Sequence, residues 1–300
     1  MALLKNTFAW FRMGMIKAKE EMKLAEGKNE AVEILTEEQL HEQDLQRIKD
    51  FRLMDDDFLN ACFADNIPAT ELMLRIILGK ADLLVNSVET QKTLKNLFGR
   101  SLRLDIKAID RLKKVYNVEV QRDNSGADPK RARYHGSLLD ANVVEPGEQF
   151  ENINETYVIF ITEKDYFEQG KPIYEADRYY RGKRNKLILL NDGLHIVYVN
   201  GAYKGKNDIG KLMHDFLCSE PDDMFFKELA DRARYFKKDE GGVKKMCKML
   251  EDMRNEEAIR NSKKIALRMI ADGKLSIEMI AQYTELPVEE VRKLAGEKSA

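Results

Sequence analysis

The stretch LRLDIKAIDRLKKVYNVEVQR, residues 102–122, predicts two β-strands joined by a short turn. In Leu102–Asp110 the apolar residues Leu, Leu, Ile and Ala alternate with Arg, Asp and Lys, and Val115–Arg122 alternates with the same period of two. Successive side chains of a strand point to opposite faces, so each segment has one apolar face and one face that carries polar groups. Because the turn is short, we expect the two strands to be antiparallel neighbours.

The register of this hairpin brings two carboxylates together. A three-residue turn at 111–113 pairs Asp110 with Lys114. Counting inward from that pair, Asp105 lies directly opposite Glu119 on the same face, with side-chain roots about 5 Å apart. A turn longer or shorter by one residue would move the two acids to opposite faces of the sheet. The register is therefore a hypothesis that a structure can test.

Hydrophobic periodicity assigns the remaining elements. Helices are expected at 56–64, 69–79 and 129–142, strands at 82–88 and 157–162, a hairpin of 186–190 with 195–199 around 191–193, and helices from 208 onward with breaks at 241–242 and 272–273. This order predicts an α/β fold, in which a mixed central sheet is flanked by helices and followed by an α-helical C-terminal extension. The strand at 157–162 is almost entirely apolar, so we expect it to be buried on both faces.

The same patterns divide the chain into three regions. Residues 1–50 form a helical arm with few large apolar anchors after Lys17, residues 51–206 form the α/β core, and residues 207–300 are helical. The arm is interpreted as a surface helix or flexible segment, with a membrane-surface or partner-binding helix as the alternative.

Composition narrows the class of protein. The 300 residues are 43% hydrophobic and 34% charged, which is enough apolar material for a full core. Lys and Arg number 50 against 52 Asp and Glu, so a uniformly basic DNA coat is excluded and any nucleic-acid surface has to be local. No apolar run approaches the roughly 18 residues of a membrane helix. The three scattered cysteines lack metal-ligand spacing, and we expect a soluble cytoplasmic protein with free thiols.

Basic charge gathers around the predicted hairpin and the helix after it. Residues 100–134 contain ten Lys or Arg and five Asp or Glu, a net +5, whereas residues 139–177 contain two and ten, a net −8. The two segments are either solvated faces that balance each other, or the first forms a wall that faces phosphate groups. Charge counts alone leave both interpretations open.

The facing acids indicate a possible metal site. Two carboxylates opposite each other repel and destabilise the hairpin unless a cation lies between them. Oxygen ligands of this kind suit Mg²⁺, which prefers one or two carboxylates together with water and substrate phosphate. The alternative is an ordinary surface, on which Arg103 and Lys107 neutralise Asp105 as exposed cross-strand pairs.

Several short blocks of sequence occur in order between Phe51 and Lys238. They are Gly99-Arg100-Ser101 with Asp105, Tyr116-Asn117-Val118-Glu119-Val120-Gln121, Lys130-Arg131-Ala132-Arg133-Tyr134, Leu138-Leu139-Asp140-Ala141, Gly147-Glu148-Gln149-Phe150, Tyr157-Val158-Ile159-Phe160-Ile161-Thr162 and His195-Ile196-Val197-Tyr198-Val199-Asn200-Gly201. Together they closely resemble the PD-(D/E)XK nuclease-family transposases, which belong with the recombination-promoting nucleases (Rpn) of bacteria. The resemblance implies a restriction-endonuclease-like core and a metal-dependent DNA endonuclease.

The resemblance also implies roles for individual residues. Asp105 and Glu119 would be the two acids that bind Mg²⁺, and the backbone carbonyl of Val120 often contributes in such sites. Gln121 stands where the name-giving lysine of the motif usually lies. A glutamine can orient the attacking water but brings no positive charge to the developing phosphate, so activity is expected to be weaker. Glu71, on the preceding helix, would match an extra metal-facing acid, and its alternative is a solvated helix residue.

The basic residues of these blocks are candidates for nucleic-acid contact. This set is Arg100, Arg103, Lys130, Arg131, Arg133 and Tyr134. Lys130 and Arg131 share a helix face with Tyr134, near a helix N-terminus that favours phosphate. In the alternative, Tyr134 packs on the sheet and the arginines are ordinary surface residues. His135 adjoins this cluster and is interpreted as a bystander.

The C-terminal tail resembles a helix-turn-helix. Ser276 is expected to cap its first helix and Pro287 to open the second. Glu289 and Glu290 begin that second helix and would repel phosphate, which favours packing or self-association, including a homodimer, over DNA reading. Two functions remain open for the whole chain. The first is a metal-dependent DNA endonuclease, and the second is nucleic-acid binding without turnover, which Gln121 favours. DNA is the expected partner of both.

Overall fold

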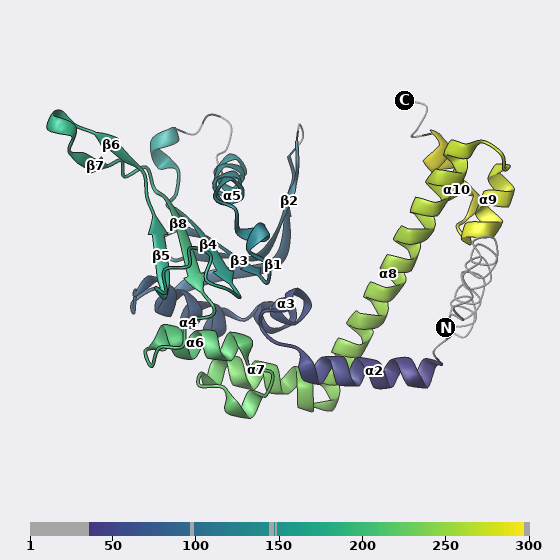
Figure 1. Cartoon of the computed structure of the whole chain (residues 1–300), viewed down its shortest axis with the longest axis horizontal. Coiled ribbons are helices and arrows are strands. Elements are labelled where there is room, and N and C mark those ends of the chain that lie inside the picture. Colours follow the sequence, from purple (N-terminus) through teal and green to yellow (C-terminus); the bar gives the residue numbers. More distant parts are fainter. Residues whose placement is uncertain (1–35, 97–98, 144–146, 148, 297–300) are drawn as a thin grey trace. The chain divides into compact units, whose positions relative to one another are not determined.

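A six-stranded mixed sheet lies at the centre of this computed structural model, which describes residues 36–96, 99–143, 147 and 149–296 (Figure 1). The chain divides into two units, residues 47–243 and residues 1–46 with 244–300. The sheet belongs to the first unit. Residues 1–35 of the predicted arm lie outside the described residues, and the rest of that arm is helical, as expected.

The elements follow one another along the chain as three helices, three strands, a helix and a strand, with further strands and helices after them. The helices are α2 (Glu37–Asp50), α3 (Asp56–Phe63), α4 (Ile67–Leu78), α5 (Pro129–Ala141), α6 (Asp208–Leu217), α7 (Lys227–Lys238), α8 (Glu240–Asp272), α9 (Ile277–Thr284) and α10 (Val288–Gly296). The strands are β1 (Val85–Leu94), β2 (Leu102–Asp110), β3 (Val115–Gln121), β4 (Thr156–Thr162), β5 (Ile173–Ala176), β6 (Tyr179–Arg181), β7 (Leu187–Leu189) and β8 (Leu194–Asn200).

The strand order of the main sheet is β1-β2-β3-β4-β8-β5. β1, β2 and β3 are antiparallel neighbours, β3, β4 and β8 run parallel, and β5 is an antiparallel edge strand. Every residue of β4 is buried, because strands flank it on both sides and helices cover the sheet. The predicted α/β class, with a mixed central sheet flanked by helices, is confirmed as an architecture.

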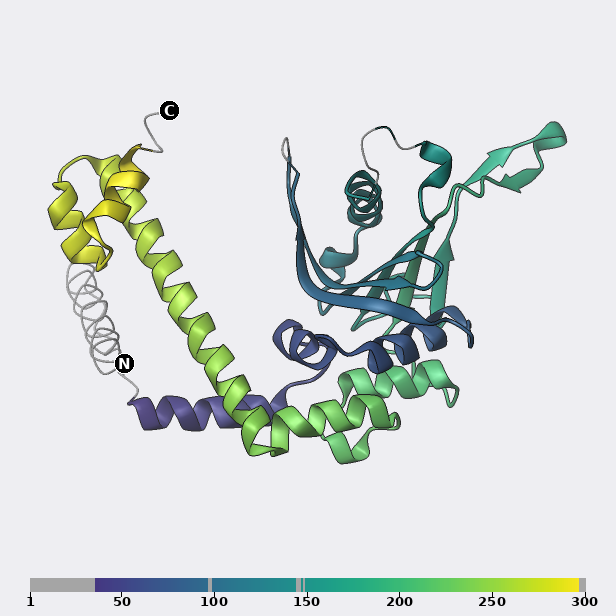
Figure 2. The ribbon, with the colours of Figure 1, turned by 180° about the vertical axis from the view of Figure 1, so that it is seen from behind.

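Helices cover both faces of the sheet. α5 packs on β4 and β8, whereas α4 packs on β1 and α3 on β1 and β2 (Figures 1 and 2). α6 and α7 form a further layer against α3 and α4. The buried core under α5 includes Leu104, Ala132, Leu139, Val158 and Phe160.

The predicted hairpin of 186–190 with 195–199 is wrong. β7 pairs with β6 in a separate two-stranded ribbon, and β8 pairs with β4 and β5 in the main sheet. The chain does turn between them, with positive φ at Asn191 and Gly193. That turn leads from the largely exposed β7 into the core, where Leu194–Asn200 is largely buried beside β4.

The predicted boundary between 206 and 207 falls inside the first unit, because α6 and α7 pack against the core helices. The ring of Phe216 in α6 lies 6.2 Å from that of Phe63 in α3. In α7, the buried Lys237 ammonium donates hydrogen bonds to the carbonyls of Lys49, Phe51 and Ser219. Each of these acceptors satisfies part of a charge that would otherwise be costly to bury.

The glycines at 241–242 do not end a helix as expected. α7 ends at Lys238, and the glycines lie in the first turn of α8. A Cβ at Gly242 would lie 2.0 Å from the carbonyl oxygen of Tyr235, so this glycine permits close approach of the chain to α7. The predicted break at 272–273 is confirmed, since α8 ends at Asp272 and Gly273 has a φ of 68°.

The second unit contains the predicted tail. The end of α8 packs with α9 and α10 around a small apolar core. Ser276 caps α9 by accepting a hydrogen bond from the N–H of Met279 at 3.2 Å, as expected. Glu290 forms an ion pair with Lys263 of α8 at 2.6 Å, so this acid contributes to packing within the tail. None of the described helices combines the length and the apolar character that crossing a bilayer requires.

Candidate active site

The register of β2 and β3 is the predicted one. Ile106 lies opposite Val118, and the pairs that follow toward the turn keep the same register. One step beyond Ile106, Asp105 and Glu119 therefore extend from the same face, where the N–H of Asp105 donates to Glu119 Oε1 at 3.4 Å. The two acids meet in the structure as the alternation of the two strands predicts.

The two strands separate at this point. Regular pairing ends at Ile106 with Val118, and the N–H of Val120 donates at 3.0 Å to Asp105 Oδ2 instead of continuing the ladder. In an antiparallel pair the N–H and C=O of one residue point to the same neighbouring strand. The carbonyl of Val120 therefore also points toward β2, on the side of Asp105, where the resemblance implies a ligand.

Burial makes both acids difficult to ionise. Glu119 is 1% exposed, and burial raises its pKa well above the ordinary value, with a further contribution from the charge of Asp105. Burial also raises the pKa of Asp105 to about 6, although the hydrogen bond from Val120 opposes this shift. Near neutral pH the pair therefore tends to retain a proton. A divalent cation would stabilise the same two groups in their ionised form.

Arg131 of α5 connects three polar groups beside this pair. Its guanidinium lies 3.5 Å from Glu119 Oε2, donates to Gln121 Oε1 at 3.4 Å and donates to His135 Nε2 at 3.3 Å. The side chain remains 39% exposed, so it also faces solvent. Arg131 is predicted as a phosphate contact, and the structure places it next to Glu119 and Gln121.

His135 is part of this cluster and not a bystander. It is fully buried, and burial together with the charges of Arg131 and Arg100 lowers its pKa to about 4, so the ring is neutral at physiological pH. Its Nε2 accepts from Arg131, and its Nδ1 lies 3.0 Å from Asn117 Nδ2 and 3.6 Å from Glu119 Oε1. The spacing of four residues from Arg131 on one helix is the signal that links the two.

The Gln121 amide occupies space that is open only because the facing residue is a glycine, which the sequence patterns do not single out. Gly126 lies in the short 3₁₀ turn Asn124–Ala127, which directly follows β3. A Cβ at this position would lie 1.8 Å from Gln121 Oε1. Only a glycine therefore permits the observed position of the glutamine amide beside Arg131.

Glu71 does not join the acid pair. Its carboxylate forms an ion pair with Arg75 at 2.6 Å and accepts a hydrogen bond from the N–H of Val85 at 2.9 Å, which connects α4 to the start of β1. The acid whose charge acts on Asp105 is Asp56, at the beginning of α3. Glu71 is therefore not the extra acid beside Asp105 that the resemblance implies. Helix α4 directs Glu71 toward β1, and α3 supplies the acid near Asp105, which is Asp56.

In the part of the chain that the structure describes, no three His, Cys, Asp or Glu side chains form a group that could hold a metal ion. Asp105, Glu119 and the Val120 carbonyl nevertheless match the oxygen donors of Mg²⁺, which usually retains several waters and does not require an all-protein cage.

The remaining basic candidates are exposed, and only Arg103 among them has an electrostatic effect on Asp105. Arg103 lowers the pKa of Asp105 and of Asp56 through its charge, so it lies close to both. Arg100, Lys130 and Arg133 are exposed, and within the described ranges their side chains form no ion pair.

Tyr134 has a structural role in this surface. Its hydroxyl donates to the carbonyl of Arg100 and accepts a hydrogen bond from Asn96 Nδ2 at 2.9 Å. The ring packs against the core under α5. These contacts connect α5 to the segment between β1 and β2 and favour the packing alternative for this tyrosine.

Comparisons of the chain with protein-family models, with curated proteins and with solved structures found no match. The resemblance to the PD-(D/E)XK nuclease-family transposases stays a prediction.

Proposed function

We propose that this chain is a metal-dependent nuclease that hydrolyses phosphodiester bonds in DNA, in a recombination or transposition setting of the kind that the sequence resemblance implies. The observation that carries the proposal is the buried pair of Asp105 and Glu119 at the point where β2 leaves β3. Two acids with raised pKa values, close to several cations, are typical of a site adapted to chemistry and not to stability.

The residues around the pair have separable tasks in this proposal. Asp105, Glu119 and the Val120 carbonyl would hold Mg²⁺, which when bound polarises a phosphoryl oxygen and lowers the pKa of a water. Gln121 would orient the attacking water through its amide. Arg131, hydrogen-bonded to Gln121, would supply the positive charge that the missing lysine normally brings to the phosphate.

A plasmid-nicking assay tests the proposal. Purified protein is incubated with supercoiled plasmid in Mg²⁺, in Mn²⁺ and in EDTA, and relaxed product is measured over time. We expect metal-dependent nicking that Asp105→Ala and Glu119→Gln reduce by a factor of a hundred or more, a loss on the order of 3 kcal/mol in transition-state stabilisation.

Glu71→Gln is the matched control. It neutralises the third acid that the resemblance implies as a metal ligand, which the structure places away from Asp105 and Glu119. We expect it to nick at a rate within about threefold of the parent protein, a difference under 1 kcal/mol. Nicking by Asp105→Ala at the parental rate would show that the site is assigned wrongly.

A second function is favoured by Gln121. Without the motif lysine, the chain would bind nucleic acid and not turn it over, so its affinity would be indifferent to Mg²⁺ and would fall steeply with salt. Gln121→Lys distinguishes the two functions. If the parent protein does not nick plasmid but gains nicking with this substitution, the result supports nucleic-acid binding without turnover. If the parent protein itself nicks plasmid, the result supports the nuclease function.

A further inference from the structure

The hairpin of β6 and β7 stands apart from the main sheet. The two strands pair only with each other, with Tyr179 opposite Leu189 and Arg181 opposite Leu187. In both ribbon views the hairpin projects beyond the end of β8, and no helix covers it (Figures 1 and 2). Residues 178–190 are called the basic ribbon below. The sequence pattern does not predict this hairpin, because it favours pairing of β7 with β8.

The basic ribbon exposes apolar side chains on both of its faces. Among the described residues, it contributes five of the fourteen exposed large apolar side chains: Tyr179, Tyr180, Leu187, Leu189 and Leu190. Tyr179 is 56% exposed and Leu187 59%. A two-stranded hairpin is marginally stable by itself, and clustered exposed apolar groups mark surfaces that bind a partner.

The charge of the basic ribbon identifies the chemistry of that partner. The segment has the sequence RYYRGKRNKLILL, with five cations and no acid. Arg178 is engaged by Asp192 at 2.8 Å. Within the part of the chain that the structure describes, the remaining four cations have no ion pair, and all are exposed: Arg181, Lys183, Arg184 and Lys186. An unneutralised cluster of this size is complementary to a polyanion.

The two tyrosines of the basic ribbon are adjacent in β6 and are followed directly by the cluster of cations at its tip. Surfaces that bind nucleic acid combine cations that contact phosphates with aromatic rings on which bases stack. A two-stranded ribbon also has dimensions that the major groove of a duplex admits. An acidic protein would match the charge but would not require two adjacent exposed tyrosines. These features together favour a nucleic acid.

We propose that the basic ribbon binds nucleic acid outside the candidate active site, with its cations on the phosphates and its tyrosines against the bases. This inference deepens the proposed function, because it assigns a second contact to the same substrate class. The ribbon enters the sheet at Leu194, which is level with Val115 of β3: it lies two strands, about 10 Å, across the sheet from β3 and about 13 Å along the strand direction from Glu119. It therefore holds the flanking nucleic acid and does not contact the scissile phosphate.

Fluorescence anisotropy with a labelled 30-base-pair duplex and a labelled 30-nucleotide single strand tests the inference. EDTA is present throughout, so that no cleavage occurs. Arg181→Glu/Arg184→Glu is compared with Arg260→Glu/Lys264→Glu, which makes the same change in charge at exposed cations of α8 in the second unit. Thermal unfolding and circular dichroism confirm that both variants remain folded.

We expect the ribbon variant to bind at least tenfold more weakly and the control to bind within twofold of the parent. The slope of log affinity against log salt should fall by about one for each phosphate that the variant no longer neutralises. Equal weakening in the two variants would reduce the effect to net charge and overturn the inference, as would an unchanged affinity of the ribbon variant.

Tyr179→Ala/Tyr180→Ala separates stacking from charge. We expect a loss of about tenfold or more with an unchanged salt slope, because stacking is independent of counterion release. The arm that loses more affinity, duplex or single strand, identifies the form of nucleic acid bound. If both ribbon variants dissociate a dimer in sedimentation experiments and leave nucleic-acid affinity unchanged, the ribbon is a self-association surface and the inference fails.

The nicking assay separates this inference from the proposed function. Asp105→Asn should bind the duplex in EDTA like the parent and fail to nick plasmid. A parent that never nicks but binds through the ribbon rejects the nuclease and retains the ribbon. A parent that nicks while both ribbon variants bind normally retains the nuclease and rejects the ribbon.

Discussion

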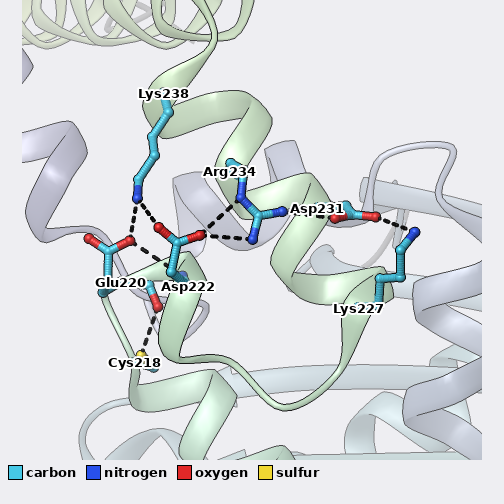
Figure 3. A network of polar contacts seen from close by, with 7 residues as sticks. All are labelled: Cys218, Glu220, Asp222, Lys227, Asp231, Arg234 and Lys238. Carbon is cyan, nitrogen blue, oxygen red and sulfur yellow. Dashed lines mark hydrogen bonds and ion pairs between the residues drawn. The ribbon is translucent and has the colours of Figure 1, made fainter.

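Two clusters of charged residues in this chain have opposite electrostatic character. On the surface of α7, Lys238 binds both Glu220 and Asp222 at 2.6 Å, and Arg234 binds Asp222 and Asp231 at 2.9 Å (Figure 3). Lysine and arginine partners lower the pKa of each of these three carboxylates. Every acid of this network therefore has a cation and remains ionised.

The acid pair of β2 and β3 is arranged in the opposite way. Asp105 and Glu119 face each other, their burial raises both pKa values, and the nearest ion pair reaches only Glu119, from Arg131 at 3.5 Å. The surface network satisfies its charges, whereas the buried pair retains an unfavourable arrangement that folding has to tolerate. Proteins keep such arrangements where function requires them, which is why the pair, and not the network, is the candidate site.

The largest expected effect is a gain of stability when the pair is neutralised. Ionisation of Asp105 disfavours the folded state, so this penalty is absent below about pH 4 and develops as pH rises through about 6. Asp105→Asn in EDTA should therefore be more stable than the parent at pH 8, by at most about 3 kcal/mol, and equally stable at pH 4. Urea unfolding at both pH values measures the difference. A variant that is less stable at pH 8 would contradict the assigned strain.

Metal addition should relieve the same strain. At pH 8, MgCl₂ at ten times its Kd should stabilise the parent by about 1.4 kcal/mol, because the ion binds only the folded state. Asp105→Asn should show no such increase in Tm, and neither should the parent at pH 4, where both acids are protonated. An equal increase in the variant would indicate binding elsewhere on the chain.

A smaller effect is expected at Gly126, which contacts the site only through Gln121. Gly126→Ala should displace the glutamine amide and slow nicking about tenfold, since small misplacements of a positioning group are costly. Gly241→Ala is the control, because its Cβ would meet only an ordinary contact at 3.7 Å. The double variant with Gln121→Ala should be no slower than Gln121→Ala alone. Additive losses would show that Gly126 acts by another route.

The smallest effect is expected in the surface network. Asp222→Asn removes contacts to Lys238 and Arg234, but all three groups are solvent-exposed, where ion pairs contribute little and salt screens them. We expect no resolvable change in Tm at 150 mM salt and neutral pH. Because the pKa of Asp222 is lowered, any stabilisation would be lost as pH falls below about 4. If Asp222→Asn clearly lowered the Tm at neutral pH, the surface network would contribute to stability and would no longer differ from the buried pair in the expected way.

Local patterns in the sequence were sufficient for much of the fold. The bounds of β2 agree with the predicted Leu102–Asp110, and the register that places Asp105 opposite Glu119 is also confirmed. The reason is that strand alternation and turn length are properties of neighbouring residues, and together they determine which side chains share a face. Helices α3, α4 and α5 were predictable for the same reason, from apolar periodicity and the proline near the start of α4 and of α5.

Only the tertiary structure decided which distant groups surround the acid pair. The helix α5 brings Arg131 and His135 to Glu119, and α3, in place of α4, supplies the acid that acts on Asp105. The pairing of β7 with β6 and the packing of α6 and α7 on the core helices depend on long-range burial in the same way. Alternation along a strand determines the face on which a side chain lies, but burial between distant elements determines which groups lie beside it and how far its pKa shifts.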